Sequence, residues 1–471
     1  MKVCLICEGS YPYVPGGVSG WVQMLCSNLK DVEFMIWSIA TTREEMKEYK
    51  YQLPENIKAV ETIYLGDTLF KTKYKKVKLS SEEKEILRRL IRSNTEMIEW
   101  EATLEFLKKY KIQLVDLLMS EQFYDICLEE YLESGSVEPF KKYLWNFRGM
   151  YFSFMNPLTG EIPKADVYHS LSTGYAGILG SSASYIEGKP LILSEHGIYT
   201  REREEDIIRS EWIQGRFKEI WIDFFKKISL IAYQQSEIVT SLFEANRSLQ
   251  VELGCPLDKI QIIPNGVSIE EYSNLPSMNK LKRGYFHIGT VLRVVPIKDV
   301  KTMLLAFDMV QEKMPESFLS IMGGYEENPE YYEECLSLVE ALNIKNVQFF
   351  GRVNIKEYLP EIDLMLLSSI SEGQPLAILE GLAAGKPFVS TNVGDCRSLL
   401  EGNEGDSIGK AGYIVPVMDS KAMADTILKC ASDLEGLKQM GVNGRNRVQK
   451  HYTKHAFLEK YKEIYSGFGR E

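Results

Sequence analysis

Two glutamates could act together on one ligand. Glu372 and Glu380 stand in the run SEGQPLAILEGLAAGKP with seven residues between them. Ionised carboxylates accept hydrogen bonds and therefore suit the hydroxyl groups of a ligand. The run lies between two apolar stretches, IDLMLLSSI and PFVST, which have the composition of buried strands. A loop and helix after a parallel strand form the usual ligand site of an α/β sheet, so the pair predicts a ligand that carries hydroxyls.

The same run predicts a helix whose start could bind phosphate. Pro375 suits the first position of a helix, and Gly385 suits the position just after its end. The free backbone N–H groups of Leu376 and Ala377 would then point at the ligand, together with the turn at Gly373. An anion site beside carboxylates fits a nucleotide sugar.

Two cations follow an apolar strand earlier in the chain. In HIGTVLRVVPIKDV, Arg293 and Lys298 come after the strand and before a predicted helix. Arginine offers a planar fork of donors and lysine a point charge, and both can neutralise a diphosphate. Near the start of the chain, Gly16 and Gly17 follow the short strand KVCLIC, and a backbone without side chains lets a sugar phosphate approach closely.

These motifs resemble the retaining family-four glycosyltransferases, which have a Glu-x7-Glu signature. The resemblance implies that Glu372 contacts the hydroxyls of the donor sugar and Glu380 those of the ribose. It also implies that Arg293 and Lys298 hold the diphosphate and that Gly17 lies in the amino-terminal glycine loop. Reaction with retention at the anomeric carbon, by attack on the face that the diphosphate leaves, is expected on the same grounds, as is a uracil base.

The runs PYVPGGVSGW, DVYHSLSTGYAG and SEHGIYTRER are similar to those of the Pel-type branch of this family, which makes exopolysaccharide. By resemblance, His196 is expected near the donor sugar. His169 and Arg201 are candidates for contact with the saccharide acceptor. Two places depart from the common family pattern. Asp395 and Ser398 stand where many relatives carry Gly-Gly and a following Pro-Glu, and Leu292 precedes Arg293 where Gly-Arg is commonest.

Apolar strands alternate with amphipathic helices along the chain, which is typical of an α/β fold. The resemblance implies the GT-B architecture, with two Rossmann-like domains facing across a cleft. The predicted strands are 2–7, 33–39, 60–65, 166–170, 190–194, 237–241, 259–263, 286–291, 318–322, 347–350, 363–367, 387–391 and 412–415.

The polar stretch EEYSNLPSMNKLKRG is the predicted domain linker. It divides the chain into an acceptor domain at 1–275 and a donor domain at 276–452. A helical insertion is expected at about 81–155, with Ser80 or Ser81 capping its first helix. A last helix at about 453–471 should complete the first domain.

Composition excludes several other classes. A net charge of −11 argues against nucleic-acid binding, which needs a basic face. No apolar run is long enough to span a membrane, and the first residues are too short an apolar stretch for a signal peptide. We therefore expect a cytoplasmic protein. If the polymer is secreted, membrane-bound polysaccharide synthase or export subunits must carry it across, and these partners would place the protein at the inner face of the cell membrane. The five lysines of KTKYKKVK, at 71–78, are interpreted as a solvated loop, with docking to an acidic surface as the alternative.

No metal cofactor is expected. The sequence contains no Asp-x-Asp pair, and the acidic loop at Glu404 and Asp406 is interpreted as a surface turn. Cys4 and Cys7 are three apart in a strand and so point to opposite faces, which predicts buried thiols rather than a metal site.

Three functions remain open from the sequence. The first is a glycosyltransferase that uses a nucleotide sugar, with UDP-glucose or a UDP-N-acetylhexosamine as donor. The second is a UDP-sugar epimerase on the same fold, and the third is a non-catalytic nucleotide-sugar-binding subunit of a secretion complex. The complete set of Glu372, Glu380, Arg293 and Lys298 favours the first.

Overall fold

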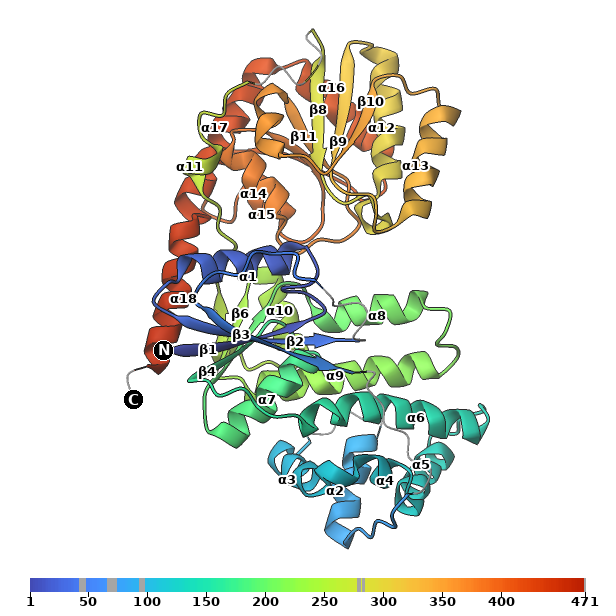
Figure 1. Ribbon diagram of the computed structural model, residues 1–471. Coiled ribbons are helices and arrows are strands. Elements are labelled where there is room, and N and C mark those ends of the chain that lie inside the picture. The colour runs from blue at the N-terminus through green and yellow to red at the C-terminus, as the bar shows by residue number, and fades with distance from the viewer. Residues whose placement is uncertain (42–47, 66–73, 93–97, 278–280, 282–283, 470–471) are drawn as a thin grey trace. The chain divides into compact units, whose positions relative to one another are not determined.

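The computed structural model describes the chain except for residues 42–47, 66–73, 93–97, 278–280, 282–283 and 470–471. It divides into two compact units, Met1–Ile262 with Tyr461–Glu471 and Ile263–Lys460. Each unit contains one sheet of parallel strands with helices around it (Figure 1). The α/β class predicted from the sequence is therefore confirmed.

Unit 1 contains a seven-stranded sheet in the order β3-β2-β1-β4-β5-β6-β7. Its strands are β1 (Lys2–Glu8), β2 (Glu33–Ala40), β3 (Ile57–Tyr64), β4 (Val167–Ser170), β5 (Leu191–Glu195), β6 (Ile238–Ser241) and β7 (Ile260–Ile262). Its helices outside the insertion include α1 (Gly17–Asn28), α7 (Tyr175–Glu187), α8 (Tyr199–Arg209), α9 (Phe217–Gln235) and α10 (Glu244–Glu252). The strand order reverses direction between β1 and β4, where ligands of such sheets bind.

The predicted helical insertion lies between β3 and β4. It consists of α2 (Ser81–Ile91), α3 (Trp100–Tyr110), α4 (Leu114–Leu118), α5 (Glu121–Glu133) and α6 (Phe140–Met155). Ser80, one of the two serines predicted to cap this helix, is the N-cap of α2 and forms a capping box with Glu83. Of the lysine run, 71–73 lie outside the described residues, while Lys75 donates its backbone N–H to Asp116 at 2.8 Å.

Unit 2 contains a six-stranded sheet in the order β10-β9-β8-β11-β12-β13. Its strands are β8 (Phe286–Val291), β9 (Ser317–Met322), β10 (Val347–Gly351), β11 (Leu364–Leu367), β12 (Phe388–Thr391) and β13 (Gly412–Val415). Its helices are α11 (Ile269–Tyr272), α12 (Val300–Lys313), α13 (Pro329–Ala341), α14 (Leu376–Ala383), α15 (Cys396–Glu401), α16 (Ser420–Ala431), α17 (Leu434–His451) and the start of α18 (Lys454–Phe468). Here the strand order reverses between β8 and β11.

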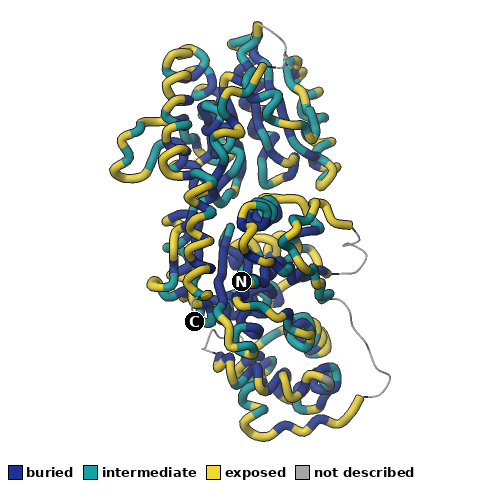
Figure 2. Tube along the Cα trace, turned by 60° about the vertical axis from the view of Figure 1, so that its left-hand side comes forward, coloured by how far each residue is buried: buried dark blue, intermediate teal, exposed yellow. Residues whose placement is uncertain are grey.

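The central strands of both sheets are buried along almost their whole length, whereas the edge strands β3, β7 and β10 are largely half-buried or exposed; Figure 2 shows the buried interior of each unit. Every predicted strand is present, with ends shifted by at most a few residues, because buried parallel strands leave continuous apolar runs in the sequence. Cys4 and Cys7 are buried free thiols in β1, as predicted. Burial raises the pKa of both thiols well above the ordinary range.

The boundary between the units falls between Ile262 and Ile263, before the predicted position at 275 and 276. The segment after this boundary is tied to unit 2 by backbone bonds. Val267 N–H donates to Tyr452 at 2.9 Å, and Lys454 N–H donates to Val267 at 3.0 Å. Gly266 is needed at this crossing, because a Cβ there would lie 2.5 Å from the Thr453 carbonyl oxygen.

Candidate functional site

The predicted cations and the predicted glutamates are brought together at the reversal point of the unit 2 sheet. Arg293 and Lys298 follow β8, and Glu372 follows β11, its neighbour in the sheet. Hydrogen bonds join the loop after β8 to the loop after β11. Ile370 N–H donates to the Ile297 carbonyl at 2.8 Å, and the Ser368 hydroxyl donates to the Lys298 carbonyl at 2.8 Å.

Lys298 and Glu372 form an ion pair within this site. Lys298 Nζ lies 2.5 Å from Glu372 Oε1, and the two side chains are only 17% and 11% exposed. The Ser369 hydroxyl donates to the same oxygen at 2.5 Å. The second carboxylate oxygen of Glu372 is not used in either bond. A cation and an acceptor are thus held side by side with little solvent around them, which strengthens their electrostatic effect.

Arg293 lies at the more open side of the same loop. Its guanidinium pairs with Glu327, and both side chains are about half exposed, at 49% and 54%. Exposed pairs of this kind are weak, so Arg293 can exchange Glu327 for another anion at little cost. Gly323, which follows β9, lets the backbone pack closely against this loop at Leu292. Its φ is +142°, and a Cβ there would lie 1.7 Å from the Leu292 carbonyl oxygen.

Helix α14 begins one residue later than predicted. Pro375 is its N-cap with extended dihedrals (φ −72°, ψ 117°), and Leu376 is the first helical residue. The first bond within the helix runs from Ile378 N–H to the Pro375 carbonyl at 3.1 Å, so the N–H groups of Leu376 and Ala377 have no partner in the helix. Gly385 follows the helix with a φ of +73°, as the sequence predicts.

Gln374, which the sequence did not identify, and Asp395, which it identified only as a departure from the family pattern, hold the loop before α14. Gln374 accepts the Asn265 N–H at 2.6 Å and donates to Asp395 Oδ2 at 2.7 Å. Asp395 also donates its N–H to the Gly373 carbonyl at 2.9 Å. Burial raises the pKa of Asp395 to about 6, against the opposing effect of the Gln374 bond. The departure from the family pattern at Asp395 thus supplies an anchor for the loop that carries Glu372.

Glu380 lies on α14 and is largely enclosed. Burial raises the pKa of its carboxyl above the usual range, whereas a hydrogen bond from the Tyr272 hydroxyl and the charge of Lys356 lower it. Tyr272 belongs to α11, in the stretch that the sequence analysis treated as a polar linker. Its apolar partner three residues earlier, Ile269, was the available sign of a short helix.

In unit 1, helix α1 begins at Gly17, with Gly16 as an N-cap that has no side chain to bond. A Cβ at either glycine would meet nothing within 4 Å. The folded chain around them therefore does not require glycine there, and the role expected from the resemblance stays a prediction.

His196 follows β5, at the strand end where the sequence analysis places it. Its Nε2 is buried and has no hydrogen-bond partner in the part of the chain that the structure describes. The ring packs edge-on against Trp21, with centroids 4.9 Å apart. Burial lowers the pKa of His196 to about 4, so the imidazole is neutral at physiological pH and its free nitrogen can bond a ligand.

His169 does not fit the acceptor-side role expected for it. It is fully buried, with Nδ1 2.7 Å from the Tyr465 hydroxyl and Nε2 2.7 Å from Ser194 Oγ. Burial, with a smaller effect of His196, lowers its pKa to about 3. Both ring nitrogens are used inside the protein, so His169 is a structural residue of unit 1. Arg201 lies exposed in the first turn of α8, and nothing tests its expected contact with the acceptor.

Two carboxylates in unit 1 were not identified from the sequence. Glu8, at the end of β1, accepts the Tyr199 hydroxyl at 2.8 Å and the Ala176 N–H at 3.1 Å. Glu195, at the end of β5, accepts the Tyr233 hydroxyl at 2.6 Å, and burial raises its pKa. Each is the last residue of its strand, but only the fold shows that they accept hydrogen bonds from tyrosines.

The acidic loop lies at the surface of unit 2 as predicted, with Glu404 exposed, but the Asp406 carboxylate turns inward and is buried. Asp406 Oδ2 lies 2.8 Å from Arg447 Nε, with side chains 7% and 1% exposed. Arg447 also donates to the carbonyls of Leu399, Leu400 and Gly409. Among the described residues, no group of three or more His, Cys, Asp or Glu side chains is placed to hold a metal ion.

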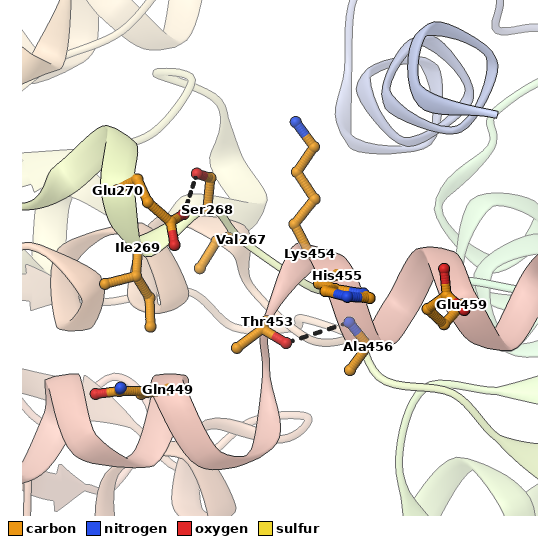
Figure 3. Close-up of a pocket in the computed structure, with 10 residues that line it drawn as sticks. All are labelled: Val267, Ser268, Ile269, Glu270, Gln449, Thr453, Lys454, His455, Ala456 and Glu459. Carbon is orange, nitrogen blue, oxygen red and sulfur yellow. Dashed lines mark hydrogen bonds between the residues drawn. The ribbon is translucent and has the colours of Figure 1, made fainter. Parts of the chain in front are cut away.

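A cavity of about 560 Å³ opens in unit 2 where α11, the end of α17 and the start of α18 meet (Figure 3). Its lining includes Glu270, Lys454 and His455, and Figure 3 shows Glu270 bonded to Ser268. The predicted donor residues are not among those that line it. No helix within the described ranges is long and apolar enough to cross a membrane.

Comparison with known proteins gives two family matches. Residues 1–258 match the family described as "Domain of unknown function (DUF3492)", and residues 274–447 match "Glycosyl transferases group 1".

Curated relatives match parts of the chain. One is the N-acetyl-alpha-D-glucosaminyl L-malate synthase of Bacillus anthracis, 28% identical over 49% of this chain and 60% of that protein, so the match spans less than two thirds of it. A second is the UDP-Gal:alpha-D-GlcNAc-diphosphoundecaprenol alpha-1,3-galactosyltransferase of Escherichia coli, 25% identical over 64% of this chain and 75% of that protein. A third is the capsular polysaccharide biosynthesis glycosyltransferase CapM of Staphylococcus aureus, 25% identical over 64% of this chain and 76% of that protein.

Solved structures share the fold over nearly the whole chain. HepE of Anabaena, solved with UDP, has a TM-score of 0.63 at 14% identity, covering 99% of this chain and 100% of that one. The sucrose-phosphate synthase of Thermosynechococcus elongatus has a TM-score of 0.63 at 14% identity, covering 99% and 98%. At this identity the likeness shows the fold alone, and it confirms the GT-B architecture of two Rossmann-like domains.

Proposed function

Because the chain belongs to the family described as a domain of unknown function (DUF3492) and carries a group 1 glycosyl transferase domain, we propose that it transfers a sugar from a UDP-sugar to a growing exopolysaccharide. The observation that carries this proposal is the pair of Lys298 and Glu372 beside the start of α14. It unites a cation, a hydroxyl acceptor and free backbone N–H groups at the reversal point of one sheet.

The donor would be held by unit 2. Lys298, Arg293 and the N–H groups of Leu376 and Ala377 offer positive charge to the diphosphate. The remaining oxygen of Glu372 accepts a hydroxyl of the donor sugar. Glu380 would accept the ribose hydroxyls, in the role that the family resemblance implies.

The reaction breaks the bond between the anomeric carbon and the diphosphate oxygen, and forms a bond from that carbon to an acceptor hydroxyl oxygen. Charge that builds on the leaving diphosphate is stabilised by Lys298 and Arg293, which are in place before the reaction and so need little reorganisation. The acceptor proton passes to the departing phosphate oxygen. We propose retention at the anomeric carbon, as the family resemblance implies, by attack on the face that the diphosphate leaves. Glu372 already bonds Lys298 and Ser369 and is poorly placed to be a covalent nucleophile, which argues against retention by double displacement.

In unit 1, the neutral His196 supplies a hydrogen bond to a ligand through its unpartnered Nε2, and the open space at Gly17 admits close approach of a phosphate. Lys298, Arg293 and the start of α14 already carry positive character, so the proposal requires no metal ion.

A uracil base is supported by relatives and neighbours that act on or bind uridine nucleotides, including HepE with UDP-glucose. A polymer product is supported by the capsular polysaccharide relative and by the resemblance to the Pel-type branch. Membrane-bound synthase or export subunits are the partners that such a product would need.

Calorimetric titration tests the proposal. The protein is titrated with UDP, GDP and ADP in the presence of a chelator, and the titration is repeated on Glu380→Ala and Lys298→Ala, with Lys301→Ala as a control. Lys301, in the first turn of α12, pairs with the exposed Glu334 of α13. UDP binding without metal, weakened by the first two changes only, supports the donor site. Transfer from UDP-glucose, UDP-N-acetylglucosamine or UDP-N-acetylgalactosamine, followed by NMR of the product anomer, then tests the reaction. If no nucleoside diphosphate binds, the proposal is wrong.

A further inference from the structure

The loop that carries Glu372 joins β11 to α14 and is held differently at its two ends. At its first end, the Thr391 hydroxyl of β12 donates to the Ser369 carbonyl at 2.6 Å. At its second end, the contacts are made by Gln374, whose side chain is buried, with only 6% of the residue exposed. The position of Glu372 therefore depends on what holds Gln374.

The amide group of Gln374 joins two segments that are far apart in the sequence. Its Oε1 accepts the Asn265 N–H at 2.6 Å, and its Nε2 donates to Asp395 Oδ2 at 2.7 Å. A backbone N–H can only donate and an ionised carboxylate can only accept, so these two partners fix which way the amide faces. Asn265 Nδ2 also donates to the Gln374 carbonyl at 3.3 Å. All three residues are buried, so loss of either amide bond would leave a polar group without a partner.

Close backbone packing transmits the position of Asp395 to Glu372. The Asp395 N–H donates to the Gly373 carbonyl at 2.9 Å. A Cβ at Gly394, where φ is +50°, would lie 2.1 Å from the Gly373 carbonyl oxygen and 2.4 Å from that of Glu372. The segment that Gln374 bonds is thus in direct contact with the backbone of Glu372, and a shift of that segment would displace the glutamate.

Helix α14 is held by other contacts. Leu379 is fully buried, and a Cβ at Gly381 would lie 2.5 Å from a carbon of the Phe388 ring. Without the Gln374 bridge, the start of the helix should therefore keep its place in the core, whereas the loop with Glu372 loses one of its supports.

We propose that Gln374 is a positioning residue for the donor sugar. Its bridge between Asn265 and Asp395 keeps the carboxylate of Glu372 within reach of a sugar hydroxyl. The inference rests on the proposed function and adds a residue that affects the binding of the sugar of the donor much more than that of its nucleotide. Asn265 is the third residue of unit 2, so the sugar site is also linked to the segment by which the chain enters this unit.

The test is calorimetry on the full chain with UDP-glucose and with UDP, and the readout is the affinity for the first divided by that for the second. UDP-N-acetylglucosamine or UDP-N-acetylgalactosamine replaces UDP-glucose if the unaltered chain binds it more tightly. Gln374→Leu should lower this ratio about fivefold, most of the effect of a hydrogen bond to a charged group. The affinity for UDP should change less than about twofold, because the contacts proposed for the diphosphate do not involve Gln374.

Gln348→Leu is the matched control. Gln348 lies exposed on the edge strand β10, so the same substitution there should leave both affinities unchanged.

Double variants separate positioning from a general loss of structure. In a chain with Glu372→Gln, adding Gln374→Leu should change the ratio less than about twofold, since the group that it positions is already altered. Gln374→Glu alone sets two carboxylates against each other and should lower the ratio as Gln374→Leu does. Adding Asp395→Asn supplies an amide that can donate to the new carboxylate, which still accepts the Asn265 N–H, and should restore the ratio to within about twofold. This exchange replaces Gln374→Leu as the test if that variant does not fold.

An unchanged ratio in Gln374→Leu would overturn the inference and leave the proposed function standing, and so would equal weakening of UDP and the UDP-sugar. Failure of Asp395→Asn to improve the ratio of Gln374→Glu would also overturn it. If Glu372→Gln lowers the ratio for none of the three UDP-sugars, Glu372 holds no sugar hydroxyl, and the inference is wrong while the UDP site remains. Failure of the unaltered chain to bind any nucleoside diphosphate would refute the proposed function and the inference with it.

Discussion

Replacing Glu372 by glutamine should strengthen the binding of UDP while it removes the added affinity for a UDP-sugar. In the structure, the carboxylate holds Lys298 at 2.5 Å, and both side chains are mostly buried. A diphosphate must therefore compete with Glu372 for the lysine and must also bind beside a negative charge. Glutamine has nearly the same shape but no charge, so it frees Lys298 for the phosphate. The same change removes the charged acceptor proposed for the sugar hydroxyl.

The magnitude follows from the charges. A unit charge about 6 Å from a phosphate repels it by at most about 3 kcal/mol at an effective dielectric constant of about 20. A site that opens to solvent is screened further, which leaves about 1 kcal/mol, or about fivefold tighter binding of UDP. Lys298→Met should act in the opposite direction, weakening UDP about tenfold through loss of a charge-assisted bond.

The assay is calorimetric titration of both variants with UDP and with UDP-glucose, UDP-N-acetylglucosamine and UDP-N-acetylgalactosamine. Lys301→Met is the matched control, because Lys301 lies close by on α12 but pairs with the exposed Glu334. It should leave every affinity unchanged. If Glu372→Gln weakens UDP as much as Lys298→Met does, the ion pair persists with ligand bound, and the argument from competition is wrong.

Three further results are expected, each read from urea unfolding. Asp406→Ala should lower the stability of unit 2 by about 3 kcal/mol or more, because Arg447 is left charged and buried without its partner. Gly323→Ala should cost more than about 2 kcal/mol, since its Cβ would overlap the Leu292 carbonyl at a positive φ. Burial raises the pKa of Asp395 from its ordinary value of 3.8 to about 6, so the folded chain binds a proton in this window that the unfolded chain has lost. The stability that this proton binding contributes is complete below pH 3.8 and is lost as pH rises through about 6. Asp395→Asn should remove this pH dependence of the free energy of unfolding. If the difference in unfolding free energy between the two proteins stays constant across this pH range, the prediction is wrong.

The strands and the order of the motifs could be predicted because they depend on neighbours in the sequence. Buried parallel strands require continuous apolar runs, which the sequence shows for both sheets. The ends of α14 follow from Pro375 and Gly385, with an error of one residue at the start. The Glu372 and Glu380 pair could be found because it spans the loop and helix that follow β11, and the cations because they lie in the loop that follows β8.

Contacts across long stretches of sequence were decided only by the tertiary structure. The sequence treated Tyr272 as part of a linker, yet the fold buries it in the same core cluster as Leu379 of α14. It offered His169 as a candidate for contact with the acceptor, whereas Tyr465 and Ser194 lie within hydrogen-bond distance of both ring nitrogens.

The fold also decided the roles of Lys298 and Asp395. One pairs with Glu372 and the other supports Gln374, and neither partner is near in sequence. Local periodicity determines which segments become strands and helices. Which side chains meet depends on how the strands are ordered and how the helices pack on them, and an isolated sequence pattern carries little information about that order.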